Sequence, residues 1–281
     1  MFDPRFETVS RAPAAALGLA GSRVFDVAGC LPPAPRLAIV GSRAAHRRVR
    51  RLVPAMVAAA GGCGWSIVSG GALGIDGDAH RAALAHGVPQ LAVLPCGRDR
   101  PYPPDHEMLF ARLVREGGGG LLFAQPQGAA PSRSMFASRN TIVVGLARAV
   151  IVAQAAVRSG SFGTGRLALR QGKRVLVGAG SRGCATLMAL GAERMPAATE
   201  LADLQAAIEG WLEAVVDDRP APWTDAWPGH LQWLRPYFAE RGSRGLTVDD
   251  LPDPLAGLCA LTEAESRRLV EEVAPGRFVA A

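Results

Sequence analysis

Short apolar runs alternate with longer stretches of helical period from Arg36 onward. The runs are rich in β-branched and other apolar residues and are bounded by turn-forming residues, which is typical of buried strands. The expected strands are Leu37–Val40, Trp65–Ser69, Leu91–Leu94, Leu121–Phe123, Ala149–Ala153 and Val175–Val177. The expected helices are 46–60, 75–86, 105–116, 134–147, 163–171, 183–190 and 200–214. This alternation predicts an α/β fold with a doubly wound, mostly parallel sheet.

Proline content and periodicity divide the chain into four parts. Residues 1–35 contain several prolines and no clear period, so we expect an irregular lead-in. The α/β domain occupies 36–216. A linker over 217–229 is indicated by three prolines, Pro220, Pro222 and Pro228. A small C-terminal module remains over 230–281.

The C-terminal module combines two expected helices with extended segments. The elements in chain order are a helix over 230–240, the segment Leu246–Leu251, a helix over 262–273 and an extended segment over 276–279. This order is compatible with a small helical, winged-helix-like appendage. Its acidic balance favours contact with a protein over contact with DNA phosphates.

Charge is distributed unevenly along a chain that is otherwise composed like a globular protein. The 281 residues are 49% hydrophobic and 20% charged, enough to bury a full core. Residues 36–195 carry 21 basic and 7 acidic side chains, whereas the remainder carries 10 and 18. GC-rich coding explains why 30 of the 31 cations are arginine but not this asymmetry. A basic domain with acidic flanks indicates a polyanionic partner.

Other function classes find no support in the composition. The cysteines Cys30, Cys63, Cys96, Cys184 and Cys259 form no Cys-x-x-Cys pair, so neither disulfides nor a metal site is expected. The longest uncharged run contains six glycines and a proline, and the N-terminus makes a poor signal peptide. We therefore expect a cytoplasmic protein with no membrane contact and no cofactor.

Three glycine-bearing turns each follow an expected strand and open an expected helix. In a parallel sheet such turns gather at the carboxyl ends of the strands, where backbone N–H groups and helix N-termini attract phosphate. The candidate phosphate-binding residues are Gly41, Ser42, Arg43, Ser69, Gly70, Gly71, Ser159, Gly160, Ser161 and Thr164. The arginines that follow Arg43 either extend this site or form a solvated helix face.

Asp76 and His80 lie one turn apart on the helix expected after the second turn. A hydrogen bond between them would brace the loop. General acid or base chemistry would need a nucleophile that the sequence does not indicate, and two ligands are too few for a metal. We assign the pair a structural role and expect no catalytic residue.

The segment Arg133-x-x-Phe136-x-x-Arg139-Asn140 places cations beside an aromatic ring on one helical face. Arginines neutralise phosphates and an aromatic ring stacks on bases, which are the two contacts that a flexible nucleotide strand needs. The alternative is a core phenylalanine beneath exposed arginines. Tyr102, in the proline-rich turn after the third strand, either lines the pocket or fills that turn, and we favour the second interpretation.

Five motifs, taken in order, resemble the DprA/Smf family over residues 36–195. They are Gly41-Ser42-Arg43, Ser69-Gly70 through Asp76 and His80, Cys96-Gly97 with Tyr102-Pro103, Phe136-x-x-Arg139-Asn140, and Ser159-Gly160-Ser161 with Thr164. The resemblance implies a Rossmann-like domain that binds single-stranded DNA, forms a homodimer and loads a RecA-type recombinase during natural transformation. It places nine residues around the DNA pocket: Arg43, Ser69, Gly70, Arg133, Phe136, Arg139, Asn140, Ser159 and Gly160.

The chain departs from the family pattern at several positions, which indicates a divergent paralogue. Thr141 replaces an arginine, Gln154 replaces an acidic residue, and Ala179-Gly180 replaces a Pro-Gly pair.

Two rival functions use the same fold. One is a sensor of a nucleotide-derived signal. The other is a phosphoribohydrolase resembling the Lonely Guy type, but Leu167 stands where that enzyme needs a glutamate.

Overall fold

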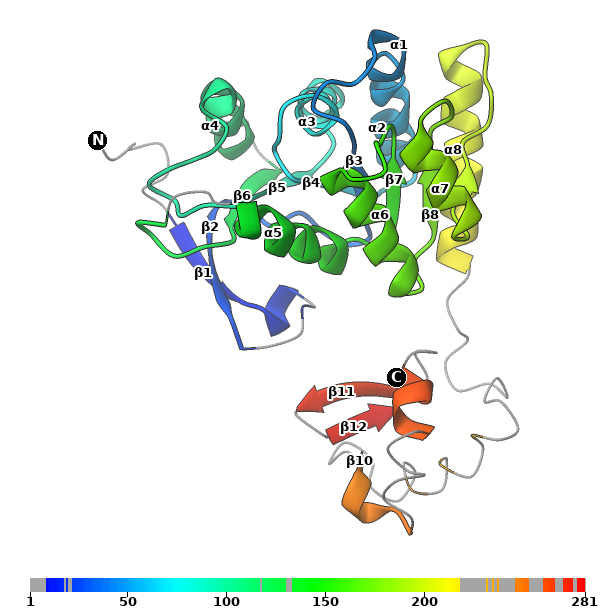
Figure 1. Cartoon of the computed structure of the whole chain (residues 1–281). Helices are drawn as coiled ribbons and strands as arrows, with labels where there is room; N and C mark the ends of the chain where they lie inside the picture. The colour runs from blue at the N-terminus through cyan, green and yellow to red at the C-terminus, as the bar shows by residue number, and fades with distance from the viewer. Residues whose placement is uncertain are drawn as a thin grey trace. The chain divides into compact units, whose positions relative to one another are not determined.

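The computed structural model divides the chain into two compact units, Met1–Asp217 and Asp218–Ala281 (Figure 1). The described residues are 9–17, 19, 22–116, 118–129, 133–217, 231, 234, 237, 246–252, 260–265, 270–274 and 277–280. Each unit has its own hydrophobic core.

The first unit is built on a nine-stranded sheet. Its strands are β1 (Val9–Pro13), β2 (Val24–Gly29), β3 (Arg36–Val40), β4 (Ser66–Ser69), β5 (Gln90–Leu94), β6 (Gly119–Phe123), β7 (Ala149–Val152), β8 (Val175–Val177) and β9 (Glu193–Arg194). They lie in the order β1-β2-β6-β5-β4-β3-β7-β8-β9. Following this order across the sheet, all neighbours from β6 through β5, β4, β3, β7 and β8 to β9 pair in parallel. Strand β2 pairs with β6 antiparallel. The predicted α/β class and the six predicted strands are confirmed.

Helices cover both faces of this sheet, as Figure 1 shows. They are α1 (Arg47–Arg50), α2 (Val53–Gly62), α3 (Ile75–His86), α4 (Glu107–Arg115), α5 (Arg133–Leu146), α6 (Gly160–Arg170), α7 (Arg182–Ala189) and α8 (Leu201–Asp217), with short 3₁₀ turns η2 (Ala15–Leu17) and η3 (Pro104–His106). Side chains of α2, α3, α4 and α8 pack on one face and those of α5, α6 and α7 on the other. Burial on both faces explains why the central strands are continuously apolar.

One predicted helix is divided in two. The segment expected to be helical over 46–60 forms α1 and α2, because Pro54 lies at the start of α2. Proline lacks an N–H group and is tolerated in the first turn but not in a helix interior. Over the described ranges, the helices include none long and apolar enough to cross a bilayer.

Strand order reverses between β3 and β7, and this reversal positions the functional site. The chain runs outward from β3 to β4, β5 and β6 on one side and to β7 and β8 on the other. Loops at the carboxyl ends of β3 and β7 therefore diverge and leave a crevice, the usual ligand site of such sheets. Gly41 follows β3, and a Cβ added to it would lie 2.6 Å from Ile75 Cγ1, so glycine lets α3 pack closely.

The expected irregular lead-in is wrong for residues 9–13 and 24–29, which form strands β1 and β2. Strands β1 and β2 pair antiparallel and extend the sheet beyond β6. Ala12, Phe25 and Val27 join the main core. The alternating pattern was obscured because β1 buries only Ala12 among five residues that end in Pro13.

The second unit contains a three-stranded antiparallel sheet. Its strands are β10 (Leu246–Thr247), β11 (Val270–Ala274) and β12 (Arg277–Ala280), with the 3₁₀ turn η6 (Val248–Asp250) after β10. Residues 260–265 are helical. The helix expected over 262–273 is therefore wrong at its end, where β11 pairs with β12. Residues 218–229 of the expected linker and most of the expected helix 230–240 lie outside the described residues, and the winged-helix interpretation stays a prediction.

Candidate functional site

A small pocket lies at the carboxyl edge of the sheet, where four segments distant in sequence meet. It is lined by Arg43, Gly70, Ala72, Leu73, Pro95, Tyr102, Pro103, Phe136 and Arg139. These residues come from the loops after β3, β4 and β5 and from α5. The cavity measures about 20 Å³, room for about one water. A ligand of nucleotide size would therefore lie across this surface rather than inside it.

The outer layer of the pocket is an aromatic pair covered by a cation. The Arg43 guanidinium carbon lies 5.1 Å from the centroid of the Phe136 ring, within cation–π range. Tyr102 meets Phe136 edge to face, with ring centroids 5.7 Å apart and an interplanar angle of 74°. Arg43 is exposed, and both rings are half-buried. We call Arg43, Tyr102 and Phe136 the aromatic surface.

The inner layer is a buried ion pair. Arg139 Nη1 lies 3.6 Å from Asp76 Oδ2, and both side chains are only 6% exposed. The Gly70 N–H donates to the same oxygen at 3.2 Å, and the N–H groups of Gly41 and Ala72 also face this carboxylate. We call these five residues the Asp76 cluster.

Burial is the dominant influence on the titration of this pair. It raises the pKa of the Asp76 carboxyl, and the Arg139 guanidinium and the surrounding amides oppose that shift. It likewise lowers the pKa of Arg139, against the attraction of Asp76. The opposite charge thus compensates for the burial of each group, and the amides additionally stabilise the Asp76 carboxylate.

The Asp76 cluster changes the expected role of two glycine turns. Sequence reasoning assigned the N–H groups of Gly41 and Gly70 to a bound phosphate, whereas the structure directs them to an internal carboxylate. A Cβ added to Gly70 would lie 1.1 Å from Arg139 Nη1, so the guanidinium packs directly on this backbone. Arg139 therefore supports the pocket from below. Nothing in the sequence indicated that a carboxylate of the protein itself, Asp76, occupies the anion-binding position between these loops.

Hydroxyl groups expected to bind phosphate are engaged within the fold. Ser69 Oγ is buried and donates to the Ile39 carbonyl at 2.6 Å. Thr164 Oγ1, also buried, donates to the Gly160 carbonyl at 3.0 Å. Ser159 caps α6 by accepting from the Phe162 N–H at 3.2 Å. Ser42 Oγ accepts from the Ala44 N–H in an exposed turn.

The remaining predicted residues lie on α5, at the adjacent start of α6 or in the loop before α3. Asn140 Nδ2 donates to the Gly160 carbonyl at 3.3 Å and so joins α5 to α6. Ser161 is half-buried in the first turn of α6. Gly71 adopts a φ of 65°, and its carbonyl lies 2.9 Å from His106 Nδ1. Arg133 begins α5, but its side chain lies outside the described part of the structure.

The expected hydrogen bond between Asp76 and His80 is replaced by two separate pairings. Asp76 pairs with Arg139, whereas His80 Nδ1 lies 2.8 Å from the side-chain amide of Gln90. Burial lowers the pKa of His80 from 6.5 to about 4, so the ring is neutral at physiological pH. Both residues still brace the fold, through partners on other elements.

Two site residues were given no such role by the sequence analysis. For Tyr102 the turn-filling role was favoured over the pocket-lining one, but the residue lines the pocket and contacts Phe136. Gln154, after β7, accepts from the His46 N–H at 2.8 Å through Oε1 and from the Ser42 N–H at 2.9 Å through its carbonyl. It therefore fastens the loop that carries Arg43. The available signal was position, since both residues follow strands at the carboxyl edge.

Comparison with known proteins places this geometry in a family. Residues 27–206 match the family described as DNA recombination-mediator protein A. The chain belongs to this family, DprA/Smf. It is 34% identical over 255 residues to a putative DNA processing protein DprA of Mycobacterium tuberculosis, covering 88% of this chain and 55% of that protein. It is 42% identical over 143 residues to protein Smf of Escherichia coli, covering 50% of this chain and 37% of that protein. The chain thus spans about half the length, or less, of these DprA/Smf relatives.

Solved DprA structures share the fold. DNA processing protein A of Helicobacter pylori, described for its single-stranded DNA binding mode, superposes with a TM-score of 0.64 at 25% identity, over 75% of this chain and 98% of that one. DprA of Streptococcus pneumoniae gives a TM-score of 0.61 at 29% identity, over 72% and 75%. The expected resemblance to the DprA/Smf family is confirmed.

The hydrolase alternative loses support at the same time. DprA proteins are described as recombination mediators. In α6, Leu167 packs against the main core from the position where a phosphoribohydrolase needs its carboxylate.

Proposed function

We propose that this DprA-family protein binds single-stranded DNA across the aromatic surface. The observation that carries the proposal is the Arg43 guanidinium over the Phe136 ring, with Tyr102 at the ring's edge. Arg43 and Phe136 are in contact, so the cation can bind the phosphate of a nucleotide while the ring stacks on the base of the same nucleotide. The H. pylori relative, described for single-stranded DNA binding, supports the proposal.

Binding would exchange the partner of the Phe136 ring. In the free protein, Arg43 covers the ring face that a base would use. When a strand arrives, Arg43 moves to a phosphate and the base stacks on Phe136, which contributes about 1–3 kcal/mol. The Asp76 cluster is not displaced, because Arg139 is held by its ion pair beneath Gly70.

A strand suits this site better than a free nucleotide. The cavity of about 20 Å³ cannot enclose a base and a sugar. Residues 36–195 carry an excess of basic side chains. These can neutralise the many phosphates of a strand, whereas a mononucleotide offers them a single phosphate. We therefore favour the strand binder over the nucleotide sensor.

Fluorescence anisotropy with a labelled oligothymidine tests the proposal. Phe136→Leu keeps the apolar bulk but removes the ring, so we expect about tenfold weaker binding, the loss of about 1.4 kcal/mol of stacking. Phe136→Trp keeps a stacking face and retains the affinity. Failure of the wild type to bind at low salt, or equal affinity of the leucine variant, would contradict the proposal.

The mononucleotide dTMP, titrated from equimolar to a large excess over the strand, serves as competitor in the same assay. Displacement of the strand by equimolar mononucleotide would favour the sensor instead.

We infer that the bound strand is passed to a RecA-type recombinase by a homodimer, as in natural transformation. The description of the family as recombination mediators supports this inference. Light scattering of the purified protein tests the dimer, and recombinase-driven strand exchange on a coated single strand tests the transfer. A monomer, or strand exchange that this protein does not accelerate, would contradict it.

A further inference from the structure

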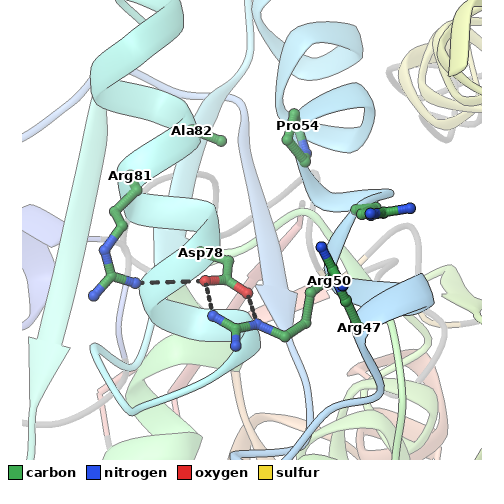
Figure 2. Close-up of a pocket in the computed structure, with 7 residues that line it drawn as sticks. Arg47, Arg50, Pro54, Asp78, Arg81 and Ala82 are labelled. Carbon is green, nitrogen blue, oxygen red and sulfur yellow. Dashed lines mark hydrogen bonds and ion pairs between the residues drawn. The ribbon is translucent and has the colours of Figure 1, made fainter.

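A second basic site lies beside the aromatic surface, between the α1–α2 segment and α3. It is a cleft of about 420 Å³. The lining residues are Arg47, Arg50, Arg51, Pro54, Asp78, Arg81 and Ala82 (Figure 2). We call it the arginine cleft.

One carboxylate organises the arginine cleft without neutralising it. Asp78 accepts from Arg50 Nε at 2.6 Å and Nη2 at 2.7 Å, and from Arg81 Nη1 at 3.4 Å. Figure 2 shows Asp78 between these two guanidinium groups. Within the described part of the chain, Arg47 and Arg51 have no acidic partner at ion-pair distance. Four exposed guanidinium groups against one carboxylate leave a charge of +3 in the cleft.

The chemistry of the lining favours a phosphodiester backbone as the ligand. Guanidinium groups match phosphate oxygens in geometry and charge. The uncharged lining is limited to Pro54 and Ala82, which offer no aromatic or deep apolar anchor of the kind on which protein partners depend. The volume accommodates a phosphate with its sugar, far more than the cavity beneath the aromatic surface.

The arginine cleft is structurally continuous with the aromatic surface. The Ile75 N–H, at the start of α3, donates to the Ser42 carbonyl at 3.4 Å. A Cβ added to Gly74 would lie 2.6 Å from the Arg43 carbonyl oxygen. The loop that carries Arg43 thus packs on the helix that carries Asp78 and Arg81, and it leads directly into Arg47.

We propose that the arginine cleft holds the phosphates of the same single strand whose bases stack on the aromatic surface. This inference rests on the proposed function and adds the direction in which the strand leaves the site. A strand long enough to reach the cleft gains contacts that a short strand cannot make. The bases over the cleft are not read, so this extension is independent of sequence.

The test compares the double variant R47Q/R51Q with a control of equal charge, R115Q/R170Q. Arg115 and Arg170 are exposed and end α4 and α6, at the opposite edge of the sheet. Binding is measured by anisotropy for oligothymidines of about 6 and about 20 nucleotides over a salt series. Arg50, Arg81 and Asp78 are left unchanged so that the walls of the cleft stay intact.

We expect R47Q/R51Q to lower the salt slope for the long strand by about 1.4, or about 0.7 for each lost phosphate contact. Between about 50 and 200 mM salt, wild-type affinity then falls about sevenfold more than that of the variant. Binding of the short strand changes less than about twofold. A long-strand slope equal to that of R115Q/R170Q would overturn the arginine cleft.

The two proposals fail in different ways. Loss of binding in Phe136→Leu together with an unchanged slope in R47Q/R51Q rejects the cleft and leaves the aromatic surface. Long-strand binding that depends on Arg47 and Arg51 but not on Phe136 supports the cleft and rejects the aromatic surface.

Discussion

Asp76 and Asp78 lie two residues apart in the first turn of α3, and each holds arginines, yet they serve different layers of the site. Asp76 is buried, pairs with Arg139 and receives backbone N–H groups. Asp78 is 15% exposed and faces the side chains of Arg50 and Arg81, which are 48% and 49% exposed. A single turn of one helix therefore carries a buried ion pair on one side and a solvated one on the other.

Burial, and not residue type, therefore decides whether an arginine of the site supports the fold or is available to contact DNA. A buried arginine that loses its carboxylate leaves an uncompensated charge, whereas an exposed arginine is rehydrated and screened. Residues in the Asp76 cluster should therefore affect stability first. Arginines that face solvent, such as Arg43 and Arg47, should affect DNA binding with little effect on stability.

The largest effect is expected from breaking the buried pair. Asp76→Asn leaves the Arg139 charge buried without its carboxylate and should lower the free energy of unfolding by about 3–5 kcal/mol. Asp78→Asn removes ion pairs whose arginine partners are about half exposed and readily rehydrated, and it should cost about 1 kcal/mol or less. Urea unfolding of both variants measures the contrast. Equal destabilisation by the two substitutions would refute the assignment of separate layers.

A pH titration of stability sharpens the same contrast at His80. Its folded-state pKa is lowered from 6.5 to about 4, so the unfolded chain binds the proton more readily. The contribution of neutral His80 to the free energy of unfolding is fully present above about pH 6.5. It is lost as the pH falls towards 4, so that stability decreases by about 3 kcal/mol over this window. His80→Leu should flatten the stability curve over this window. A curve in the His80→Leu variant as steep as that of the wild type would contradict this account.

A smaller effect is expected from filling the space above Arg139. Gly70→Ala places a Cβ against Arg139 Nη1, and the guanidinium must move away from Asp76, at a cost of about 2 kcal/mol. Gly210→Ala, in α8, meets nothing within 4 Å and should stabilise by up to about 1 kcal/mol. Thermal unfolding distinguishes the two glycines by the sign of the change. A stabilised Gly70→Ala variant would show that the close approach is not needed.

Much of the first unit could be predicted because its signals are local. Apolar runs bounded by turns identified β3 to β8. These strands are buried on both faces, so they can be predicted without knowing which strands they pair with. Strand β1 has one buried residue and β11 has a composition suited to a helix, so only pairing with β2 and β12 determines them.

The sequence predicted that these residues gather at the carboxyl edge of the sheet, but not which of them contact one another. Spacing on one helix suggested that Asp76 would bond to His80, whereas its partner Arg139 lies on α5, far along the chain. No local sequence pattern predicts that a carboxylate on α3 accepts hydrogen bonds from backbone N–H groups of the two loops that precede it. Phe136 and Arg43 were predicted to contact DNA, and this stays a prediction; their stacking on each other depends on how α5 crosses the sheet.

The most direct test of the central claim is the salt dependence of oligothymidine binding by wild type, Arg43→Gln and the control Arg115→Gln. If the aromatic surface holds a single strand, Arg43→Gln should reduce the salt slope by about 0.7 and weaken binding while thermal stability stays unchanged. Arg115→Gln should bind like the wild type. A slope for Arg43→Gln equal to that of the wild type, with equal affinity, would contradict the account.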